Sequence, residues 1–228
     1  MQDRHVIITG GAGGLGVTVV EEALSRGARV TVPHLGRHGL ERLEARLGRP
    51  DALTLVEADL TQEGDVAKLF AGSLDALIHL MGGFTMEPLH EMELSDFRSH
   101  IDLQLTGTFL CCKHALRRMH DSGYGRIVTV GSKAVDIPMA QMGAYAAGKA
   151  GVVALTRTIA EEAKSLDDVT ANVVLPSVID TPANRQAMGT DDRHKWVKPS
   201  NLAETICFLA SEAARDLRGA VIPIYGKM

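Results

Sequence analysis

Short apolar runs alternate with segments of helical periodicity along the whole chain. The apolar runs have the length and the β-branched content of buried strands, and they cover residues 5–9, 29–32, 52–57, 75–80, 126–131, 170–175 and 220–224. The segments between them predict helices at 14–26, 40–47, 63–71, 94–119, 144–164 and 199–214. Strands joined through crossover helices form a parallel sheet that is covered on both faces. The pattern therefore predicts an α/β fold with a doubly wound, seven-stranded parallel sheet flanked by helices.

The chain of 228 residues is expected to form one domain over residues 1–228, because it shows no internal repeat, low-complexity tract or linker. Residues 176–199 have weak periodicity and contain Pro182, Gly189 and the pair Asp191-Asp192. We interpret this segment as a mobile substrate loop that carries a short helix over the site.

Composition and charge argue against several classes of function. The net charge is −4 at pH 7 and neither sign forms a long run, so no surface for nucleic acid or for a membrane is predicted. The N-terminus has no apolar signal segment and no run is long enough to span a bilayer, so we expect a soluble, cytoplasmic protein. The three cysteines fit a reducing compartment. No His or Cys cluster has the spacing of metal ligands, so no metal is assigned.

Three polar residues near the fifth predicted strand form the candidate catalytic group. Ser132 lies where that strand ends, and Tyr145 and Lys149 are four residues apart on the next helix, so their side chains share a face. An ammonium near a phenol stabilises the phenolate and is expected to lower the pKa of Tyr145. Together the three groups can hold and protonate one carbonyl oxygen. The alternative is that Tyr-x-x-x-Lys occurs by chance and that Ser132 merely ends a strand.

A glycine-rich turn follows the first predicted strand and opens the first helix, with the sequence TGGAGGLG at residues 9–16. Gly10, Gly14 and Gly16 would let the backbone, with Leu15, approach a dinucleotide pyrophosphate at the helix N-terminus. The spacing is not that of the usual G-x-G-x-x-G fingerprint, so the turn alone is a weak signal.

This turn, with Ser132, Tyr145 and Lys149 at intervals of 13 and 4 residues, resembles the classical short-chain dehydrogenase/reductase family over essentially the whole chain. The resemblance implies a single-domain, Rossmann-type fold and an NAD(P) site. Tyr145 and Lys149 contribute to this site, and Lys149 holds the ribose of the cofactor. It implies further cofactor contacts at the positions that match the family's motifs, namely Asp59, Leu60, Gly82, Pro176, Ile179 and Thr181.

The chain departs from the family's pattern in four places, of which Pro176-Ser177 for Pro-Gly and Tyr225-Gly226-Lys227 for Asp-Gly-Gly are expected to change shape and not chemistry. Gln104 stands where the family has a catalytic asparagine, and we expect it to substitute in part for that residue in a proton relay to Lys149. The segment His79-Leu80-Met81 replaces the residues that usually precede Gly82. These departures leave open a protein that binds the dinucleotide with weak activity and a regulatory role.

The end of the second predicted strand bears on the choice of cofactor. Residues 30–37 contain no carboxylate, whereas an acid at this point binds the ribose hydroxyls of NAD. Arg37 or His34 can pair with the 2′-phosphate of NADP, so the sequence weakly favours NADP(H) over NAD(H). The alternative is that Arg37 is simply a solvated residue before the next helix.

The site and the resemblance together predict an NAD(P)-dependent oxidoreductase that interconverts a carbonyl and an alcohol. In this reading Tyr145 is the acid/base and Ser132 orients the oxygen, while an isomerase or epimerase that uses the same cofactor is the alternative enzyme. The expected partner is a small-molecule substrate. The segments that should rim its pocket contain Met81, Phe84, Met86, Met139, Met142, Met188 and Trp196. Small residues in the predicted helix 144–164 and apolar residues in the predicted helix 94–119 are similar to the helices through which the family forms dimers and tetramers. The resemblance therefore implies a homotetramer, with a homodimer as the alternative.

Overall fold

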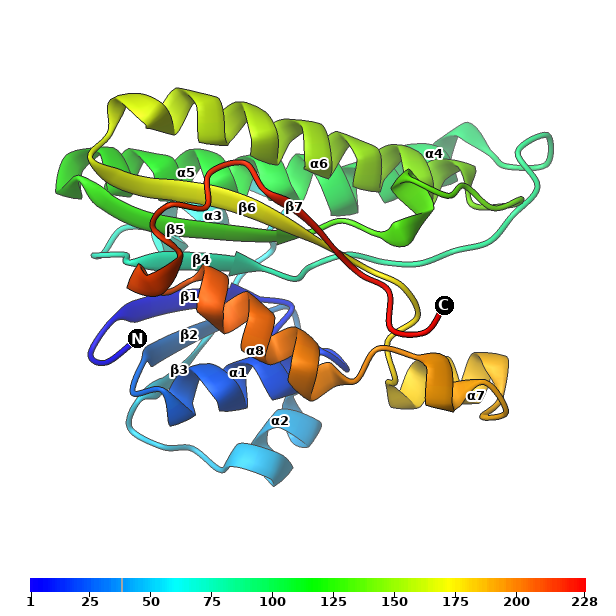
Figure 1. The fold of residues 1–228 in the computed structure, drawn as a ribbon, viewed down its shortest axis with the longest axis horizontal. Helices are drawn as coiled ribbons and strands as arrows, with labels where there is room; N and C mark the ends of the chain where they lie inside the picture. The colour runs from blue at the N-terminus through cyan, green and yellow to red at the C-terminus, as the bar shows by residue number, and fades with distance from the viewer. Residues whose placement is uncertain (38) are drawn as a thin grey trace.

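A computed structural model describes residues 1–37 and 39–228 and contains a seven-stranded parallel sheet in the order β3-β2-β1-β4-β5-β6-β7 (Figure 1). This confirms the predicted doubly wound α/β fold. The strands are β1 (His5–Thr9), β2 (Arg29–His34), β3 (Leu53–Glu57), β4 (Ala76–His79), β5 (Tyr124–Val130), β6 (Asp168–Pro176) and β7 (Val221–Ile224).

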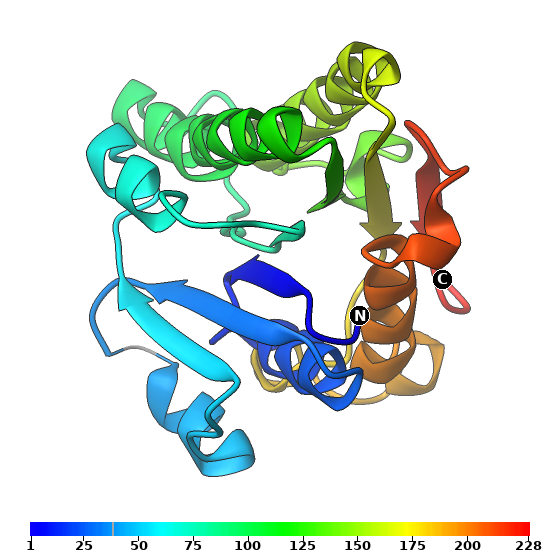
Figure 2. The same cartoon turned by 90° about the vertical axis from the view of Figure 1, so that its left-hand side faces the viewer.

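Helices connect the strands and cover the sheet on both faces (Figure 2). They are α1 (Gly16–Ser25), α2 (Leu40–Leu47), α3 (Glu63–Leu69), α4 (Leu94–Ile101), α5 (Gly107–Ser122), α6 (Gly143–Glu162), α7 (Pro182–Met188) and α8 (Pro199–Leu209). Alternate strand residues face opposite layers. Val6 and Ile8 of β1 pack with α1 and α8 in one core cluster, whereas Ile7 packs with α3, α5 and α6 in the other.

The order of the strands places a crevice at the centre of the sheet. From β1 the chain winds outward to the edge strand β3, and then returns to pair β4 with the other side of β1. At such a reversal the connections after the two central strands diverge to opposite faces, which opens a crevice at their carboxyl ends. The glycine-rich turn after β1 and the loop after β4 therefore border the same crevice.

The predicted helix over residues 94–119 is interrupted, which corrects the sequence-based expectation. It consists of α4, a π-helical turn at Asp102–Thr106, and α5. A π-helical turn inserts an extra residue into the hydrogen-bond ladder and is frequent at functional sites. Here the turn carries Gln104, which is fully buried.

The predicted substrate loop at 176–199 contains helix α7 and a short 3-10 turn at Arg193–Lys195. Thr181 caps α7, because its hydroxyl oxygen accepts from the backbone N–H of Asn184 at 3.3 Å. An isolated bridge pairs Ile179 with Val197 and ties the two ends of the segment together. None of the helices within the described residues is both long enough and apolar enough to cross a membrane.

Candidate active site

Ser132 lies two residues beyond the end of β5, at the carboxyl edge of the sheet. Its backbone is extended, and its hydroxyl oxygen accepts from the N–H of Ala134 at 3.1 Å. The side chain is buried. This local hydrogen bond fixes the hydroxyl at the start of the loop that leads to α6.

Tyr145 lies in the first turn of α6, facing Ser132. Burial raises the pKa of the Tyr145 phenol above its usual value of 10, and the Ser132 hydroxyl acts in the opposite direction. The expectation of a lowered Tyr145 pKa is therefore wrong, because burial outweighs the opposing hydrogen bond. Spacing shows that Tyr145 and Lys149 share a helix face, but it does not show how deeply each is buried.

Lys149 lies one turn further along α6 and is buried. Its Nζ donates to the backbone carbonyl of Val130, the last residue of β5, at 2.9 Å. Burial lowers the pKa of Lys149 from 10.5 to about 8. Gly82 leaves room for this ammonium, since a Cβ atom added at Gly82 would lie 3.0 Å from Nζ. The lysine is thus enclosed between β5 and the loop after β4.

The glycine-rich turn is packed so closely that a side chain does not fit at some of its glycines. Gly10 adopts a φ of +66°, a conformation that L residues rarely adopt. A Cβ atom at Gly16 would lie 2.0 Å from the carbonyl oxygen of Gly10. Helix α1 begins at Gly16, and Leu15 before it provides no side-chain cap. The N–H groups of Val17 and Thr18 bond the carbonyl oxygens of Gly13 and Leu15, and the positive end of the helix dipole at this terminus fits an anionic pyrophosphate.

Two contacts join the turn to neighbouring loops. The Thr9 hydroxyl oxygen accepts from the N–H groups of Leu80 and Met81, at 3.2 and 3.3 Å, and this links the ends of β1 and β4. A Cβ atom at Gly14 would lie 3.1 Å from the Thr181 side chain. The residues predicted at the pyrophosphate and at the nicotinamide are therefore neighbours.

The other predicted cofactor residues lie around the same edge. Pro176 is buried as the last residue of β6, and Ile179 follows in the paired segment before α7. Asp59 follows β3, where its Oδ1 accepts from the N–H and the hydroxyl of Thr61 at 2.9 and 2.7 Å. Leu60 is a buried core residue. Asp59 thus shapes its own loop in the structure.

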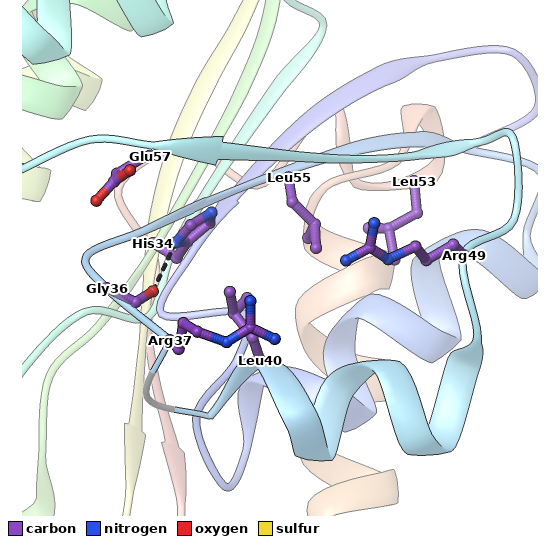
Figure 3. Close-up of a pocket in the computed structure, with 8 residues that line it drawn as sticks. All are labelled: His34, Gly36, Arg37, Leu40, Arg49, Leu53, Leu55 and Glu57. Carbon is purple, nitrogen blue, oxygen red and sulfur yellow. Dashed lines mark hydrogen bonds between the residues drawn. The ribbon is translucent and has the colours of Figure 1, made fainter.

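A pocket of about 460 Å³ lies between α2 and the ends of β2 and β3 (Figure 3). It is lined by His34, Gly36, Arg37, Leu40, Arg49, Leu53, Leu55 and Glu57. The Nδ1 of His34 is bonded to the Gly36 carbonyl oxygen at 2.8 Å, which makes Nδ1 the donor. Arg37 is exposed, and in Figure 3 both its side chain and that of Arg49 extend along the pocket. Glu57, at the end of the neighbouring strand β3, adds a carboxylate to this pocket although the residues after β2 contain none.

Gln104 is enclosed behind the catalytic group. A Cβ atom at Gly148 would lie 3.5 Å from Gln104 Nε2, so the glutamine packs against α6 one residue before Lys149. The backbone carbonyl of Gln104 accepts from the Thr108 hydroxyl. Neither atom of its side-chain amide has a hydrogen-bond partner among the described residues.

His79 is a buried residue to which the sequence assigned no role. It ends β4, and its Nδ1 lies 3.0 Å from the Thr9 hydroxyl oxygen. Burial and the positive charge of Lys149 lower the pKa of His79 from 6.5 to about 3. A histidine as the last residue of a fully buried strand was the available signal, because such a polar side chain needs a partner.

The loops that follow β4 and β5, and helix α7, carry exposed apolar side chains. Phe84, in the loop after β4, packs against the ring of Tyr145. Met86, Ile137, Met139 and Met188 are also exposed. Two residues expected at the rim, Met142 and Trp196, are instead buried. Within residues 1–37 and 39–228, no group of three or more His, Cys, Asp or Glu side chains is placed to hold a metal ion.

Comparison with known proteins identifies the family of the chain. Residues 4–192 match a family described as short chain dehydrogenase. The cis-4-hydroxycyclohexanecarboxylate dehydrogenase of Sinomonas cyclohexanicum is 33% identical over 98% of this chain and 96% of its own length. The crystal structure of a short-chain oxidoreductase from Burkholderia thailandensis has a TM-score of 0.89 and 31% identity, over 99% and 92% of the two chains. A variant of ElxO with NADPH bound has a TM-score of 0.91 and 25% identity, over 99% and 98%.

Proposed function

The chain belongs to the short-chain dehydrogenase family and is an NAD(P)-dependent oxidoreductase, and from this premise we propose that it interconverts a carbonyl and an alcohol at Tyr145. The observation that carries the proposal is the position of the Tyr145 phenol, which faces Ser132 one helical turn from the buried Lys149. These groups border the crevice that also holds the glycine-rich turn.

Ser132, Tyr145 and Lys149 would have separate roles in the proton transfer. Ser132 donates a hydrogen bond to the substrate oxygen, and Tyr145 gives that oxygen its proton during reduction or takes it during oxidation. The dinucleotide, when bound, supplies or accepts the hydride. The ammonium of Lys149 stabilises the phenolate that remains and donates to the nicotinamide ribose. Closure of the site around substrate would strengthen this attraction, because water screens charges less in an enclosed site.

The dinucleotide would lie across the crevice, with its pyrophosphate at Gly10, Gly14, Leu15 and Gly16. A side chain at Gly16 would collide with the turn itself, so this close backbone approach depends on glycine. Asp59 and Leu60 would border the adenine, and Gly82, Pro176, Ile179 and Thr181 would surround the nicotinamide end.

NADP(H) is the cofactor we favour. Arg37 and His34 line one pocket beyond the end of β2, and a guanidinium pairs well with a phosphate. The NADPH-bound ElxO structure shares the fold over 99% of this chain. Glu57 lines the same pocket, and its repulsion of a phosphate would reduce the preference for NADP over NAD.

The substrate would be a small apolar ketone or its secondary alcohol. Phe84 leaves apolar surface exposed beside Tyr145, and Met86, Ile137 and Met139 add exposed apolar surface on the loops after β4 and β5. Such surface favours an apolar ring or chain over a highly hydrated group. The Sinomonas relative is named for a substrate with a cyclohexane ring, which supports testing alicyclic ketones first.

A homotetramer is the proposed assembly, with a homodimer as the alternative. Phe109 on α5 is exposed, and Ala147, Ala150 and Ala154 of α6 are exposed small residues on which another helix can approach closely. Light scattering at micromolar concentration tests this, because a single species near the chain mass of 24.4 kDa would contradict it.

The proposed reaction is tested by following NADPH and NADH oxidation with cyclohexanones, linear ketones, aldehydes and quinones. Stoichiometric oxidation of the dinucleotide with formation of the alcohol supports the proposal. Conversion of a substrate without net dinucleotide turnover would indicate an isomerase or epimerase instead. Dinucleotide binding without turnover of any compound in the panel would favour a regulatory role.

A further inference from the structure

Two arginines from different parts of the segment between β6 and α8 converge on one carboxylate, that of Asp180. The Nε of Arg185, in α7, donates to Asp180 Oδ1 at 2.5 Å. The Nε of Arg193, in the 3-10 turn after α7, lies 2.8 Å from Oδ2 and 3.0 Å from Oδ1 of the same carboxylate. Asp180 therefore joins α7 to this turn, although thirteen residues separate it from Arg193.

The Asp180 carboxylate is shielded from solvent more than either of its partners. Its side chain is 12% exposed, whereas those of Arg185 and Arg193 are 38% and 48% exposed. The hydrogen bond from Arg185 lowers the pKa of Asp180 below its usual value of 3.8, burial opposes this, and Arg193 adds to the lowering. The carboxylate therefore stays charged at neutral pH. Within residues 1–37 and 39–228, neither arginine pairs with another carboxylate.

Helix α7 depends on such polar contacts because it has no apolar anchor. It is seven residues long and none of its residues is buried, and in Figure 1 it lies at the edge of the molecule. An isolated helix of this length is not stable in water. Its first turn is tied down by the Thr181 cap and by the Asn184 amide, which donates to the Ile179 carbonyl at 2.8 Å. The two ion pairs of Asp180 fix the remainder.

Asp180 also lies between two residues that border the proposed nicotinamide end, Ile179 and Thr181. Its N–H donates to the Val197 carbonyl at 2.9 Å, beside the bridge between Ile179 and Val197. The Thr181 side chain packs against the glycine-rich turn, where a Cβ atom at Gly14 would lie 3.1 Å away. A shift of Asp180 would therefore displace both of its neighbours relative to that turn.

We propose that Asp180 is a positioning residue that holds α7 and the turn at Arg193–Lys195 in one arrangement before any ligand binds, and thereby preforms the nicotinamide end of the crevice. The segment that the sequence predicts to be a mobile loop is then ordered by charge. A preformed site binds more tightly, because less conformational freedom is lost on binding. The part that concerns the dinucleotide rests on the proposed function, whereas the ordering of the segment does not.

Amide hydrogen exchange of the ligand-free protein tests the ordering directly. Mass spectrometry follows peptides that cover residues 178–198 in wild type and in Asp180→Asn, which keeps the shape of the side chain and removes its charge. We expect these peptides to exchange about tenfold faster in the variant, while peptides from β1 and β4 keep their rates. Unchanged exchange over residues 178–198 would overturn the proposal.

The matched control is Asp192→Asn, in the same segment. Asp192 pairs with Lys195 at 2.6 Å, but its side chain is 62% exposed, and such exposed pairs contribute little to stability. Exchange within about twofold of wild type is therefore expected. A rise as large as that in Asp180→Asn would show that loss of any charge loosens the segment, and would contradict the specific role of Asp180.

Arg193→Gln is a second variant that keeps Asp180 and its pair with Arg185. It should raise exchange over residues 189–198 about threefold to fivefold, because only the link to the turn is lost. Sodium chloride at about 1 M should speed exchange of the segment in wild type and have little effect in Asp180→Asn, since salt screens an ion pair. An equal effect of salt on both proteins would contradict the ionic origin of the order.

Binding then connects the segment to the crevice. Isothermal titration compares NADPH with adenosine 2′,5′-bisphosphate, which has the adenine end alone, or NADH with AMP if wild type prefers NADH. Asp180→Asn should raise the Kd of the dinucleotide about fivefold to tenfold and leave that of the adenine nucleotide within about twofold. Equal changes in the two Kd values, or none, would contradict the role at the nicotinamide end. Wild type that binds neither dinucleotide would contradict the proposed function, and the exchange rates would still decide whether Asp180 orders the segment.

Discussion

The ring of Phe84 meets that of Tyr145 edge to face, with 5.1 Å between the ring centroids and 79° between the ring planes. Phe84 is 61% exposed although it makes this contact. One part of the ring therefore supports the phenol, while the rest remains available to a substrate. An edge-to-face pair contributes about 0.5–1.5 kcal/mol beyond the area it buries, which is enough to restrict the position of Tyr145.

Replacing Phe84 by Ala should lower kcat/KM for an apolar ketone by about tenfold, since both the support for Tyr145 and the apolar contact with substrate are lost. Dinucleotide affinity should not change. Steady-state kinetics with an alicyclic and a small linear ketone are the measurement, and Phe84→Leu is the control that keeps apolar contact. Equal kcat/KM values for wild type and Phe84→Ala with both ketones would show that Phe84 does not contact the substrate.

The Tyr145→Phe variant should abolish turnover while leaving the dinucleotide Kd within about threefold, because only the transferable proton and its oxygen are removed. Rates with a confirmed substrate and fluorescence titration with NADPH check the two halves of this expectation. Activity close to that of wild type would exclude Tyr145 as the acid/base.

The Lys149→Met variant should bind the dinucleotide more weakly and turn over more slowly, yet it should be more stable at pH 7 without ligand. The folded-state pKa of Lys149 is about 8, below its ordinary 10.5. Below pH 8 the buried ammonium destabilises the fold, and this cost disappears as pH rises from 8 to 10.5, where only the unfolded chain keeps the proton.

The difference in unfolding free energy between Lys149→Met and wild type is therefore expected to be no more than about 3 kcal/mol below pH 8, and to shrink toward pH 10.5. Denaturant unfolding at pH 7 and at pH 10 measures it. A variant that is less stable than wild type at pH 7 would show that the hydrogen bond to Val130 outweighs the cost of burying the charge.

Replacing Arg37 by Ala should weaken NADPH binding by about 1–3 kcal/mol and change NADH binding little, as expected for loss of a charge-assisted hydrogen bond to the 2′-phosphate. Isothermal titration with both dinucleotides measures this. Arg49→Ala is the companion variant, because Arg49 lines the same pocket near Leu53. An equal loss for the two cofactors in Arg37→Ala would contradict its assignment, and His34→Asp should shift the preference toward NADH.

At position 104, Gln104→Ala should lower kcat, whereas Gln104→Asn should retain or raise it, if the side-chain amide takes part in moving protons to Lys149. Both variants keep the backbone carbonyl that accepts from Thr108, so they isolate the side chain. The pH dependence of kcat is the measurement, and an Ala variant with an unchanged profile would show that the amide is dispensable.

Sequence patterns predicted those elements whose ends are defined locally. Helix α2 has exactly the predicted bounds, Leu40–Leu47. Gly39 before it and Gly48 after it both have positive φ, and glycine adopts that conformation at helix ends without steric cost. The first strand also has its predicted bounds, His5–Thr9, whereas the ends of the other strands differ by up to two residues, for example Asp168–Pro176 against the predicted 170–175, because pairing with neighbouring strands decides where a strand ends.

Features that depend on burial were not available from the sequence. The π-helical turn at Gln104 and the raised pKa of Tyr145 both arise from the way α4 to α6 pack on the sheet. The motif at Ser132, Tyr145 and Lys149 predicted which residues meet, since helix spacing fixes a shared face. It did not predict that Lys149 bonds to Val130, because that contact joins a helix to a strand nineteen residues earlier.

The strand order also constrains how the protein is made on the ribosome. Strand β1 leaves the ribosome first, whereas its partner β4 lies much later in the sequence. The two strands pair through residues such as Val6 and Ala76. Until β4 has left the exit tunnel, the edge of β1 that will border the crevice is unpaired and open to wrong pairing. At that stage the crevice is incomplete, so a dinucleotide that binds across it can stabilise the chain only after β4 has been made.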